Sequence, residues 1–176
     1  DWSSDVCSSD LKVLEKMGCH CEDTPEGIVL TGAGAGKLQG IHVNMSDFSD
    51  QTMTLAAVSV FAAGETVITG VGHIRKQESD RIKAIATELN RMGIACQERE
   101  DGLLIRPDED LLTEYRDGKR TVTFETYEDH RMAMAFAVIG TKLQGITIDD
   151  PLCCRKTFEN YFQVLTNLGL SSKINK

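Results

Sequence analysis

The spacing of apolar residues along the chain predicts alternating strands and helices. Short apolar or alternating runs predict strands near residues 19–22, 27–31, 41–44, 66–70, 94–98, 102–106, 120–125 and 145–149. Longer apolar runs predict helices near residues 50–63, 78–92, 129–139 and 156–168. The helix near 78–92 places Ile82, Ile85 and Leu89 on one face, as in an amphipathic helix. This order of strands and helices predicts an α/β protein.

An internal repeat organises these predicted elements. Residues 14–32, LEKMGCHCEDTPEGIVLTG, are similar to residues 89–107, LNRMGIACQEREDGLLIRP. Each segment reads as a helix end closed by Met-Gly, a short strand, an acidic turn with glycine, and an apolar strand. Gly27 and Gly102 lie 75 positions apart, as do the two Met-Gly pairs. A fixed offset of this kind is typical of a repeated structural unit.

The repeat continues through the rest of each unit. Residues 47–62 parallel residues 126–140, and residues 66–81 parallel residues 145–161, where Arg75-Lys76 aligns with Arg155-Lys156. Each unit therefore reads as hairpin, strand, helix, strand, helix. The middle helix of each unit is apolar nearly all round. We expect these two helices to be buried, with sheets wrapped around them.

Composition describes an ordinary globular protein and narrows the classes of function. The 176 residues are 41% hydrophobic and 26% charged, and the formal net charge of −8 argues against non-specific nucleic-acid binding. No apolar run approaches the roughly 20 residues of a membrane-spanning helix. Six cysteines occur without a C-x-x-C pair, so a zinc site is not favoured. We expect reduced thiols in a cytoplasmic protein, with Cys153 and Cys154 packed as small apolar groups.

The first eleven residues, DWSSDVCSSDL, differ from the rest of the chain. They repeat Ser-Ser-Asp, lack a helical or strand period, and are similar to a translated sequencing adapter. We predict that residues 1–11 are a non-native cloning or sequencing scar and that residues 12–176 form part of one lobe. Because KVLEKMG reads as the middle of a helix, we expect a truncated N-terminus.

Two tempting motifs do not fit their usual chemistry. The run TGAGAGK at residues 31–37 lacks the Ser or Thr that comes after the lysine of a phosphate-binding loop, so a turn between strands is the better interpretation. Asp129 and His130 are adjacent, and neighbouring residues seldom orient each other as a catalytic triad requires. Asp129 reads as a helix N-cap, and His130 as a residue of helix entry or packing.

Basic residues recur at the predicted helix starts. These residues are Arg81, Arg131 and Lys156. Each alone is most simply a solvated surface charge, but a helix N-terminus with an added cation forms a strong anion site. Asp50 and Glu78 are then candidate acid/base groups beside a phosphate or carboxylate. Asp50 can equally serve as a helix cap, and Glu78 can pair with Arg75 or Arg81.

Four ordered segments resemble the 5-enolpyruvylshikimate-3-phosphate (EPSP) synthase family. RKQESDRIKAIATELNRMG, YEDHRMAMAFA and DPLCCRKTFENYF resemble its C-terminal signatures, and SDQTMTLAAVSVFAAGETVI resembles the segment with its catalytic aspartate. The resemblance runs from about residue 12 to residue 170. It implies a fold of two lobes, each made of three βαβαββ units around internal helices, of which this chain holds roughly two units.

The resemblance also implies a reaction. Family members transfer the enolpyruvyl group of phosphoenolpyruvate to the 5-hydroxyl of shikimate 3-phosphate in the shikimate pathway, which leads to aromatic amino acids, and release phosphate. They need no metal and no organic cofactor. The implied partners are these two small molecules, with neither nucleic acid nor a membrane involved.

The resemblance assigns site residues position by position. Asp50 matches the base that receives the proton of the attacking hydroxyl and also holds shikimate 3-phosphate. Glu78 matches the acid/base carboxylate near phosphoenolpyruvate. The residues matched to the clamp on its phosphate and carboxylate are Arg81, Arg131 and Lys156. Gln77 and His73 stand at substrate-binding positions where many members have Lys and Asn, respectively.

The family's site lies between two lobes, and the N-terminal lobe is not in this sequence. We therefore expect the full-length parent to be the synthase and the fragment alone to be inactive. One alternative is the sister enolpyruvyl transferase that acts on UDP-N-acetylglucosamine. A second is a non-catalytic, anion-binding domain that uses only the repeated fold.

Overall fold

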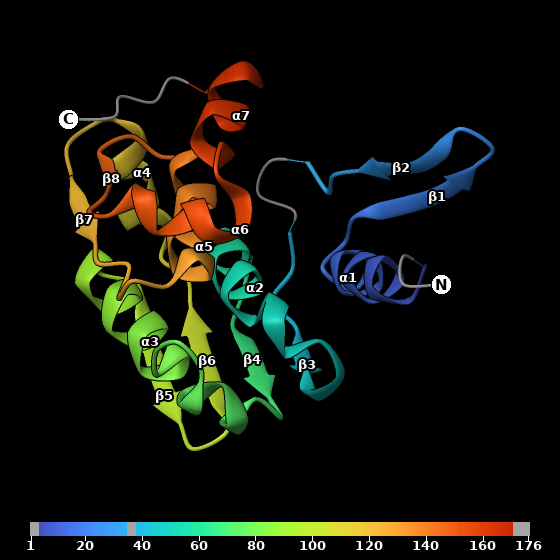
Figure 1. Ribbon diagram of the computed structural model, residues 1–176, viewed down its shortest axis with the longest axis horizontal. Coiled ribbons are helices and arrows are strands. Elements are labelled where there is room, and N and C mark those ends of the chain that lie inside the picture. Colours follow the sequence, from blue (N-terminus) through green and yellow to red (C-terminus); the bar gives the residue numbers. More distant parts are fainter. Residues whose placement is uncertain (1–3, 35–37, 171–176) are drawn as a thin grey trace.

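The computed structural model describes residues 4–34 and 38–170 as strands and helices in the predicted order (Figure 1). The strands are β1 (His20–Thr24), β2 (Gly27–Thr31), β3 (His42–Asn44), β4 (Thr66–Thr69), β5 (Ala95–Arg99), β6 (Gly102–Arg106), β7 (Val122–Phe124) and β8 (Ile146–Ile148). The α-helices are α1 (Ser4–Lys16), α2 (Thr52–Ser59), α3 (Arg81–Met92), α4 (Glu109–Arg116), α5 (His130–Gly140), α6 (Arg155–Phe158) and α7 (Tyr161–Asn167). Three 3₁₀ helices are η1 (Ser46–Gln51), η2 (Gly72–Lys76) and η3 (Pro151–Cys154). Each of the eight predicted strands is confirmed.

The helices differ from the prediction at their ends. α3 begins at Arg81 because the Asp80 carboxylate caps it, accepting a hydrogen bond of 3.0 Å from the Lys83 N–H. The predicted helix near 156–168 is two short helices, α6 and α7. The sequence pattern did not predict α4, which Asp108 caps by accepting from the Leu111 N–H. The end of the glycine-rich run, residues 35–37, lies outside the described residues.

The sheets confirm the α/β class and the repeat of two units. In the first unit β3 pairs in parallel with β4, and in the second β7 pairs in parallel with β8. The β5–β6 hairpin joins the first unit, because β6 pairs antiparallel with β4 and completes a sheet of order β3-β4-β6-β5. The first unit is therefore completed by the hairpin that comes next in the chain.

The two middle helices are buried, as predicted. α2 packs against α5 at the centre of the domain, with the four-stranded sheet outside them (Figure 1). Alanines such as Ala56 and Ala133 are almost fully buried and let the two helix backbones approach closely. Phe136 of α5 stacks on Phe124 of β7 with ring centroids 4.4 Å apart. α2 and α5 are apolar nearly all round because other parts of the domain pack against most of their surface.

The first helix joins the same core. Val13 and Met17 are buried, and the Gln39 N–H donates to the Met17 carbonyl at 2.8 Å. α1 starts at Ser4, so the helix extends into the segment that we predicted to lie outside the fold. Val13 and Met17 hold α1 in the core. Because of this anchor, the backbone can stay helical toward the N-terminus although the first eleven residues lack an apolar period. The division of the chain at residue 11 stays a prediction.

The cysteines form no disulfide in the part of the chain that the structure describes. Cys19, Cys21, Cys96, Cys153 and Cys154 are free thiols. Burial raises the pKa of Cys154 to about 12, so it packs as an apolar group, while Cys153 is only partly buried. None of the described helices combines the length and apolar character needed to cross a membrane.

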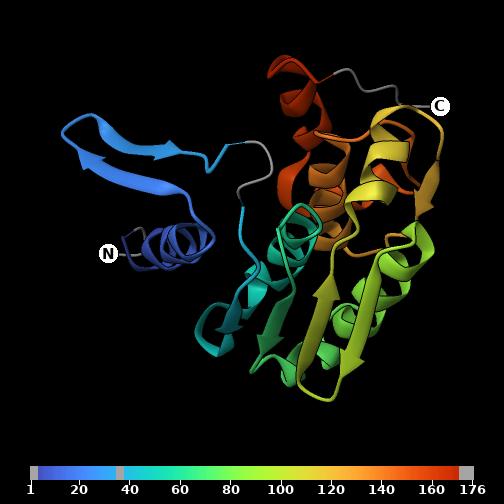
Figure 2. The ribbon, with the colours of Figure 1, turned by 180° about the vertical axis from the view of Figure 1, so that it is seen from behind.

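The β1–β2 hairpin extends away from the rest of the domain in both views (Figures 1 and 2). Within the described residues β2 pairs only with β1, and all five of its residues are exposed. Ile28, Val29 and Leu30 are exposed by 51%, 48% and 47%, respectively. By contrast, β6 at the same place in the second unit has four buried residues.

Close packing of β6 on β4 predicts that Gly102→Ala destabilises the domain. A Cβ at Gly102 would lie 1.9 Å from the Ile68 carbonyl oxygen, so the paired strands would have to separate. We expect a loss of at least about 2 kcal/mol in the free energy of unfolding, measured by urea denaturation. Gly32→Ala is the control, because a Cβ there has no neighbour within 4 Å, and it should change stability by less than about 0.5 kcal/mol. Equal stability of the two variants would contradict this packing.

Candidate active site

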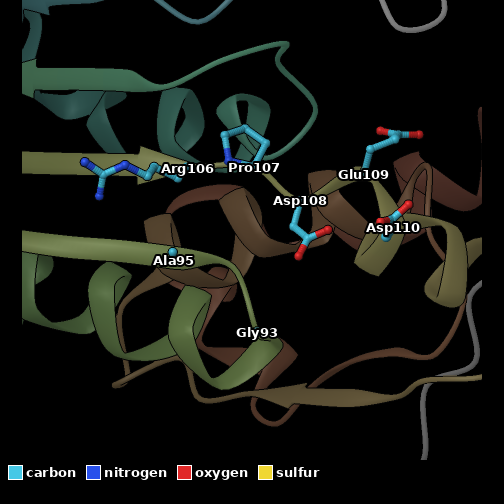
Figure 3. A pocket seen from close by; sticks show the side chains of 7 residues that line it. All are labelled: Gly93, Ala95, Arg106, Pro107, Asp108, Glu109 and Asp110. Carbon is cyan, nitrogen blue, oxygen red and sulfur yellow. The ribbon is translucent and has the colours of Figure 1, made fainter.

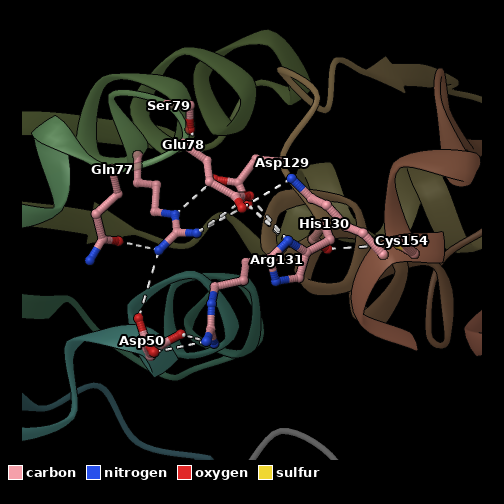
Figure 4. Close-up of polar contacts among 10 residues, drawn as sticks. Asp50, Gln77, Glu78, Ser79, Asp129, His130, Arg131 and Cys154 are labelled. Atoms are coloured by element: carbon pink, nitrogen blue, oxygen red, sulfur yellow. Dashed lines mark hydrogen bonds and ion pairs between the residues drawn. The ribbon is translucent and has the colours of Figure 1, made fainter. Parts of the chain in front are cut away.

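Four helix starts converge on one cluster of charged side chains (Figure 4). Asp50 comes from η1 just before α2, Glu78 from the loop before α3, and Arg81 from the first turn of α3. Arg131 comes from the first turn of α5, and Lys156 from α6. Since the units are repeated around a shared core, equivalent helix starts face the same region. The fold thus brings together the five residues that were site candidates in the sequence. These residues lie up to 106 positions apart in the chain.

A buried ion pair lies at the centre of this cluster. Arg81 is 3% exposed and Asp129 is 0% exposed. The Arg81 Nε donates to Asp129 Oδ2 at 2.7 Å, and its Nη2 donates to Asp129 Oδ1 at 3.2 Å. This two-bond geometry fixes the guanidinium in one plane and joins the start of α3 to the start of α5.

Asp129 has several further partners that keep it charged. Its Oδ2 accepts from the Ser79 hydroxyl at 3.1 Å, and its Oδ1 accepts from the Arg131 N–H at 3.0 Å. Burial would raise the pKa of Asp129, but the bonds from Arg81, Arg131 and Ser79 together hold that pKa below its ordinary value. Its predicted role as the N-cap of α5 is confirmed.

Asp50 and Arg131 form a second, more exposed pair. The Arg131 Nη2 donates to Asp50 Oδ2 at 2.8 Å, and its Nη1 donates to the Asp50 backbone carbonyl at 3.2 Å. The Asp50 side chain is 54% exposed and that of Arg131 is 30% exposed. On its other side, Asp50 Oδ1 lies 3.7 Å from Arg81 Nη1. Asp50 therefore stands between two cations and still faces solvent.

Glu78 lies between Lys156 and His130. The Lys156 Nζ donates to Glu78 Oε1 at 3.0 Å, and His130 Nδ1 lies at hydrogen-bond distance, 3.1 Å, from Glu78 Oε2. His130 is 7% exposed, whereas the Glu78 side chain is 38% exposed. Glu78 is thus held from behind by a buried imidazole and reaches solvent beside an exposed ammonium.

The two remaining sequence-predicted positions lie at the edge of the cluster. The Gln77 amide oxygen accepts a hydrogen bond from Arg81 Nη1. His73 Nε2 lies 2.8 Å from the hydroxyl of Ser49, the residue that precedes Asp50. In the described part of the chain His73 makes no direct contact with the charged cluster. Gln77 is therefore part of the network, and His73 joins it only through the neighbour of Asp50.

An unusual backbone turn holds the start of α5 in place. Tyr127 and Glu128 both have left-handed φ angles, 56° and 57°, which non-glycine residues rarely adopt. Glu88 of α3 is fully buried and accepts from the Tyr127 hydroxyl at 2.8 Å and from the Glu125 N–H at 3.1 Å. The same helix that supplies Arg81 thus holds the turn that presents Asp129 and its neighbours.

Glu78, Asp129 and His130 each place one ligand atom within 4.8 Å of the others, which is close enough for a metal ion. Both carboxylates, however, are already bound by cations, Lys156 and Arg81. These cations would repel a divalent metal at this distance. The cluster is better suited to holding anions and protons.

A separate shallow pocket of about 400 Å³ lies at the open end of the β5–β6 hairpin, where β5 begins and β6 leads into α4 (Figure 3). Its lining residues are Gly93, Ala95, Arg106, Pro107, Asp108, Glu109 and Asp110. None of the site residues lines it, and Asp108 already caps α4. This pocket therefore stays outside the candidate site.

Sequence reasoning found the carboxylates and cations but not their centre. It treated Asp129 as a cap only, and the structure shows that Asp129 also binds Arg81. It placed His130 in helix entry or packing, and the structure adds the contact with Glu78. One signal was available in the sequence. A buried cation such as Arg81 requires a nearby carboxylate, and Asp129, two residues before the predicted anion-binding residue Arg131, was a candidate for it.

Comparison with known proteins gives a consistent result. A family model described as EPSP synthase (3-phosphoshikimate 1-carboxyvinyltransferase) matches residues 5–165. The chain is 46% identical over 159 residues to the 3-phosphoshikimate 1-carboxyvinyltransferase of Nostoc punctiforme, a match that covers 89% of this chain and 35% of that protein. It is 41% identical over 162 residues to the chloroplastic enzyme of Arabidopsis thaliana, covering 89% of this chain and 30% of that protein. The chain thus spans about a third of the length of these relatives.

Solved structures agree on the fold. The EPSP synthase of Acinetobacter baumannii superimposes with a TM-score of 0.75 at 26% identity, over 94% of this chain and 40% of that one. The enolpyruvyl transferase NikO of Streptomyces tendae superimposes with a TM-score of 0.67 at 20% identity, over 93% of this chain and 35% of that one, a likeness of fold alone.

The buried pair predicts that Asp129→Asn destabilises the protein in a pH-dependent way. At pH 7 the substitution leaves the Arg81 charge without its partner and should cost about 3–5 kcal/mol in the free energy of unfolding. Because the pKa of Asp129 is lower in the folded state than its unfolded value of about 3.9, this stabilisation is present above that pH and is lost as pH falls through the folded pKa.

Urea denaturation of both proteins between neutral and acidic pH measures this difference. The gap between wild type and Asp129→Asn should narrow below about pH 4. Asp110→Asn, an exposed position in the first turn of α4, is the control and should stay within about 0.5 kcal/mol of the wild type. A gap that is absent at neutral pH would show that the pair does not stabilise the fold.

Proposed function

The chain belongs to the EPSP synthase family, and we propose that the protein of which it forms part is a 3-phosphoshikimate 1-carboxyvinyltransferase. The reaction is transfer of the enolpyruvyl group of phosphoenolpyruvate to the 5-hydroxyl of shikimate 3-phosphate, with release of phosphate. The observation that carries this proposal is the placement of Asp50 and Glu78, two solvent-facing carboxylates, among Arg81, Arg131 and Lys156. We further propose that the protein acts in the cytoplasm.

The cations are arranged so that two of them can exchange a carboxylate for a substrate anion. Arg131 and Lys156 are paired with carboxylates that are 54% and 38% exposed, and such exposed pairs contribute only about 0–1 kcal/mol each. A phosphate or carboxylate of the substrate can therefore displace Asp50 from Arg131 and Glu78 from Lys156. Arg81 differs, because Asp129 holds it and only its Nη1 edge faces Asp50 and Gln77.

This exchange frees the two carboxylates for proton transfer. In the first step, the hydroxyl oxygen of shikimate 3-phosphate bonds to C2 of phosphoenolpyruvate while Asp50 takes the hydroxyl proton. Glu78 must carry a proton at this stage, and it gives that proton to C3, which becomes a methyl group. In the second step, the C–O bond to phosphate breaks, C3 loses a proton back to Glu78, and the double bond re-forms. The released phosphate takes up the proton that Asp50 had accepted, so both carboxyl groups return to their starting states.

The surrounding charges suit both steps. Arg131 and Lys156 balance negative charge that collects on the leaving phosphate, as fixed cations do in a water-poor site. His130 lies 3.1 Å from Glu78 and can hydrogen-bond the oxygen that is not used for proton transfer. The buried Arg81–Asp129 pair keeps these groups at fixed spacing while protons move.

We propose that the remainder of the protein supplies a second lobe that closes over this cluster. The chain covers 35% of the Nostoc punctiforme relative, and the Asp50, Glu78 and Lys156 side chains of the cluster are exposed by 54%, 38% and 54%, respectively. The 176-residue chain alone should accordingly show no measurable phosphate release from phosphoenolpyruvate and shikimate 3-phosphate. Appreciable turnover by the isolated chain would contradict this prediction.

Activity of a completed protein tests the roles of the two carboxylates. Residues 12–170 would replace the matching part of the Nostoc punctiforme relative, and phosphate release would be measured. Asp50→Asn and Glu78→Gln should each lower kcat by roughly 10²–10⁴-fold, the usual worth of a general acid or base. Asp117→Asn and Glu109→Gln are matched controls on and beside the exposed face of α4 and should leave kcat nearly unchanged.

The same chimera separates the alternatives. Turnover with UDP-N-acetylglucosamine in place of shikimate 3-phosphate would identify the sister enolpyruvyl transferase instead. If neither Asp50→Asn nor Glu78→Gln changes phosphate release, the role of this part of the protein would be anion binding without catalysis.

A further inference from the structure

The turn before α5 is strained, and its residues are not those that such a turn favours. The Asp129 N–H donates to the Thr126 carbonyl at 2.9 Å. The two residues between them, Tyr127 and Glu128, have left-handed φ angles of 56° and 57°. Positive φ at both central positions is the pattern of a type I′ turn, in which glycine, asparagine and aspartate are favoured. Strain of this kind persists only where the surroundings fix the backbone, and it is frequent at functional sites.

Two carboxylates outside the turn fix the backbone that leads into it. Asp149, which follows β8, accepts from the Thr126 N–H at 3.0 Å. Glu88 of α3 accepts from the Glu125 N–H at 3.1 Å. Thr126 is 1% exposed and Glu88 is 0% exposed, so both bonds are shielded from water. The chain therefore enters the turn from a fixed position.

Tyr127 connects the turn itself to Glu88. Its hydroxyl donates to Glu88 Oε1 at 2.8 Å, whereas Glu88 Oε2 accepts from the Glu125 N–H. A glycine at position 127 would relieve the strained φ angle but could not reach α3. Burial and the Glu88 carboxylate raise the pKa of Tyr127, so its hydroxyl stays protonated and remains the donor. The bond to Glu88 therefore explains why a tyrosine occupies a strained position.

Glu88 is itself firmly held. It is 0% exposed, and the charge of its carboxylate is balanced by Arg91, whose Nη1 lies 3.0 Å from Glu88 Oε2. Glu88 lies seven residues after Arg81, which is two turns further along the same face of α3. α3 therefore holds the start of α5 at two points. Arg81 binds Asp129 at one point, and Glu88 binds Tyr127 at the other.

The turn places the residues that hold the rest of the site. The three residues after it are Asp129, His130 and Arg131 (Figure 4). They contact Arg81, Glu78 and Asp50, respectively, at 2.7, 3.1 and 2.8 Å. Because the three are consecutive at the start of one helix, a change in the turn would move all of them together. The conformation of the turn therefore decides the spacing of the charged cluster.

We propose that Glu88 and Tyr127 are positioning residues for the enolpyruvyl transfer. Their hydrogen bond sets the direction in which α5 begins, and so places Arg131 for a substrate anion and His130 beside Glu78. Neither Glu88 nor Tyr127 touches the reacting groups, and both act through residues 129–131. These roles rest on the function proposed above. Neither residue was a site candidate in the sequence.

Removing the Tyr127 hydroxyl tests the proposal. In the chimera defined above, Tyr127→Phe keeps the ring and removes the hydrogen bond to Glu88. The KM for phosphoenolpyruvate should rise about tenfold, because Arg131 belongs to the proposed clamp on that substrate and a hydrogen bond to a charged group is lost. The KM for shikimate 3-phosphate should change by less than about twofold, since Asp50 lies on η1 and is not placed by the turn. A merely structural role would lower the amount of folded enzyme, and with it the apparent kcat, but would leave KM unchanged.

Two control variants separate this effect from general changes in stability. Tyr115→Phe removes the hydroxyl of another buried tyrosine, which donates to the Met92 carbonyl at 3.1 Å at the far end of α3. Glu128→Asn introduces a residue that tolerates a left-handed φ angle. It loses no contact, because the exposed Glu128 side chain makes no hydrogen bond or ion pair with the residues that the structure describes. Both variants should have the KM values of the wild type.

Substitutions of Glu88 provide a rescue test. Glu88→Gln keeps both bonds, since its amide oxygen accepts from the Glu125 N–H and its amide nitrogen donates to the Tyr127 oxygen. Its KM for phosphoenolpyruvate should stay within about threefold of the wild-type value, whereas Glu88→Ala should raise that KM at least about tenfold. Adding Tyr127→Phe to Glu88→Ala should cause no further rise, because the bond is already lost. Tyr127→Phe and Glu88→Gln decide the proposal even where Glu88→Ala does not fold.

Amide hydrogen exchange of the same chimera without substrate gives a measurement that needs no activity. The Arg131 N–H donates to Asp129 Oδ1 at 3.0 Å in the first turn of α5. Tyr127→Phe should make this amide exchange about tenfold faster, because the helix start opens locally more often. The amides of β4 and β6 should keep their wild-type rates.

Three results would overturn the proposal. They are an active chimera in which Tyr127→Phe leaves the KM for phosphoenolpyruvate unchanged, an equal rise of that KM in Tyr115→Phe, and an Arg131 amide that exchanges at the wild-type rate in Tyr127→Phe. A wild-type chimera without turnover would contradict the proposed function instead. The exchange of the Arg131 amide would then still show whether Tyr127 holds the turn.

Discussion

The buried ion pair between Arg81 and Asp129 is the constraint on which the rest of the site depends. A guanidinium that is 3% exposed is tolerated only beside a carboxylate, and here two parallel hydrogen bonds satisfy both groups. The bonds also fix how far apart the starts of α3 and α5 lie. Because α3 continues to Glu88, which holds the turn before Asp129, the pair and the turn stabilise each other. The remaining charged groups are arranged around this fixed unit.

The outer pairs have a different physical character. Asp50–Arg131 and Glu78–Lys156 are exposed, so water screens their attraction and their exchange for a substrate anion costs little. The proposed reaction, which binds two anionic substrates and releases phosphate, needs such exchangeable cations. It also needs a scaffold that does not rearrange when they exchange. The contrast between one buried and two exposed pairs provides both, and it arises from where each helix begins.

Much of this arrangement was predictable from the sequence, for identifiable reasons. The strands were found because β-branched runs are bounded by glycine and acidic turns, as at Gly27 and Gly102. The cations were found because Arg81, Arg131 and Lys156 stand at helix starts, where positive charge is locally unfavourable. The pairing of Arg81 with Asp129 could not be derived in the same way, since the two are 48 positions apart and either could have faced solvent. α4 was missed because its three core residues are surrounded by charged ones. Only tertiary contact decides such cases.

The repeat that explains the site also explains the exposed apolar strand. Each unit buries its middle helix against its neighbour, and the first unit completes its sheet with the hairpin of the second. The interior of such an array is satisfied locally, while its ends retain unpaired edges. Among the described residues, β2 and β8 each have such an unpaired edge. Gly27 shows the difference directly: a Cβ there meets nothing within 4 Å, whereas at Gly102 it would strike the Ile68 carbonyl. An edge of this kind is completed when another strand pairs with it, so the difference in burial between β2 and β6 follows from the same repeat that builds the site.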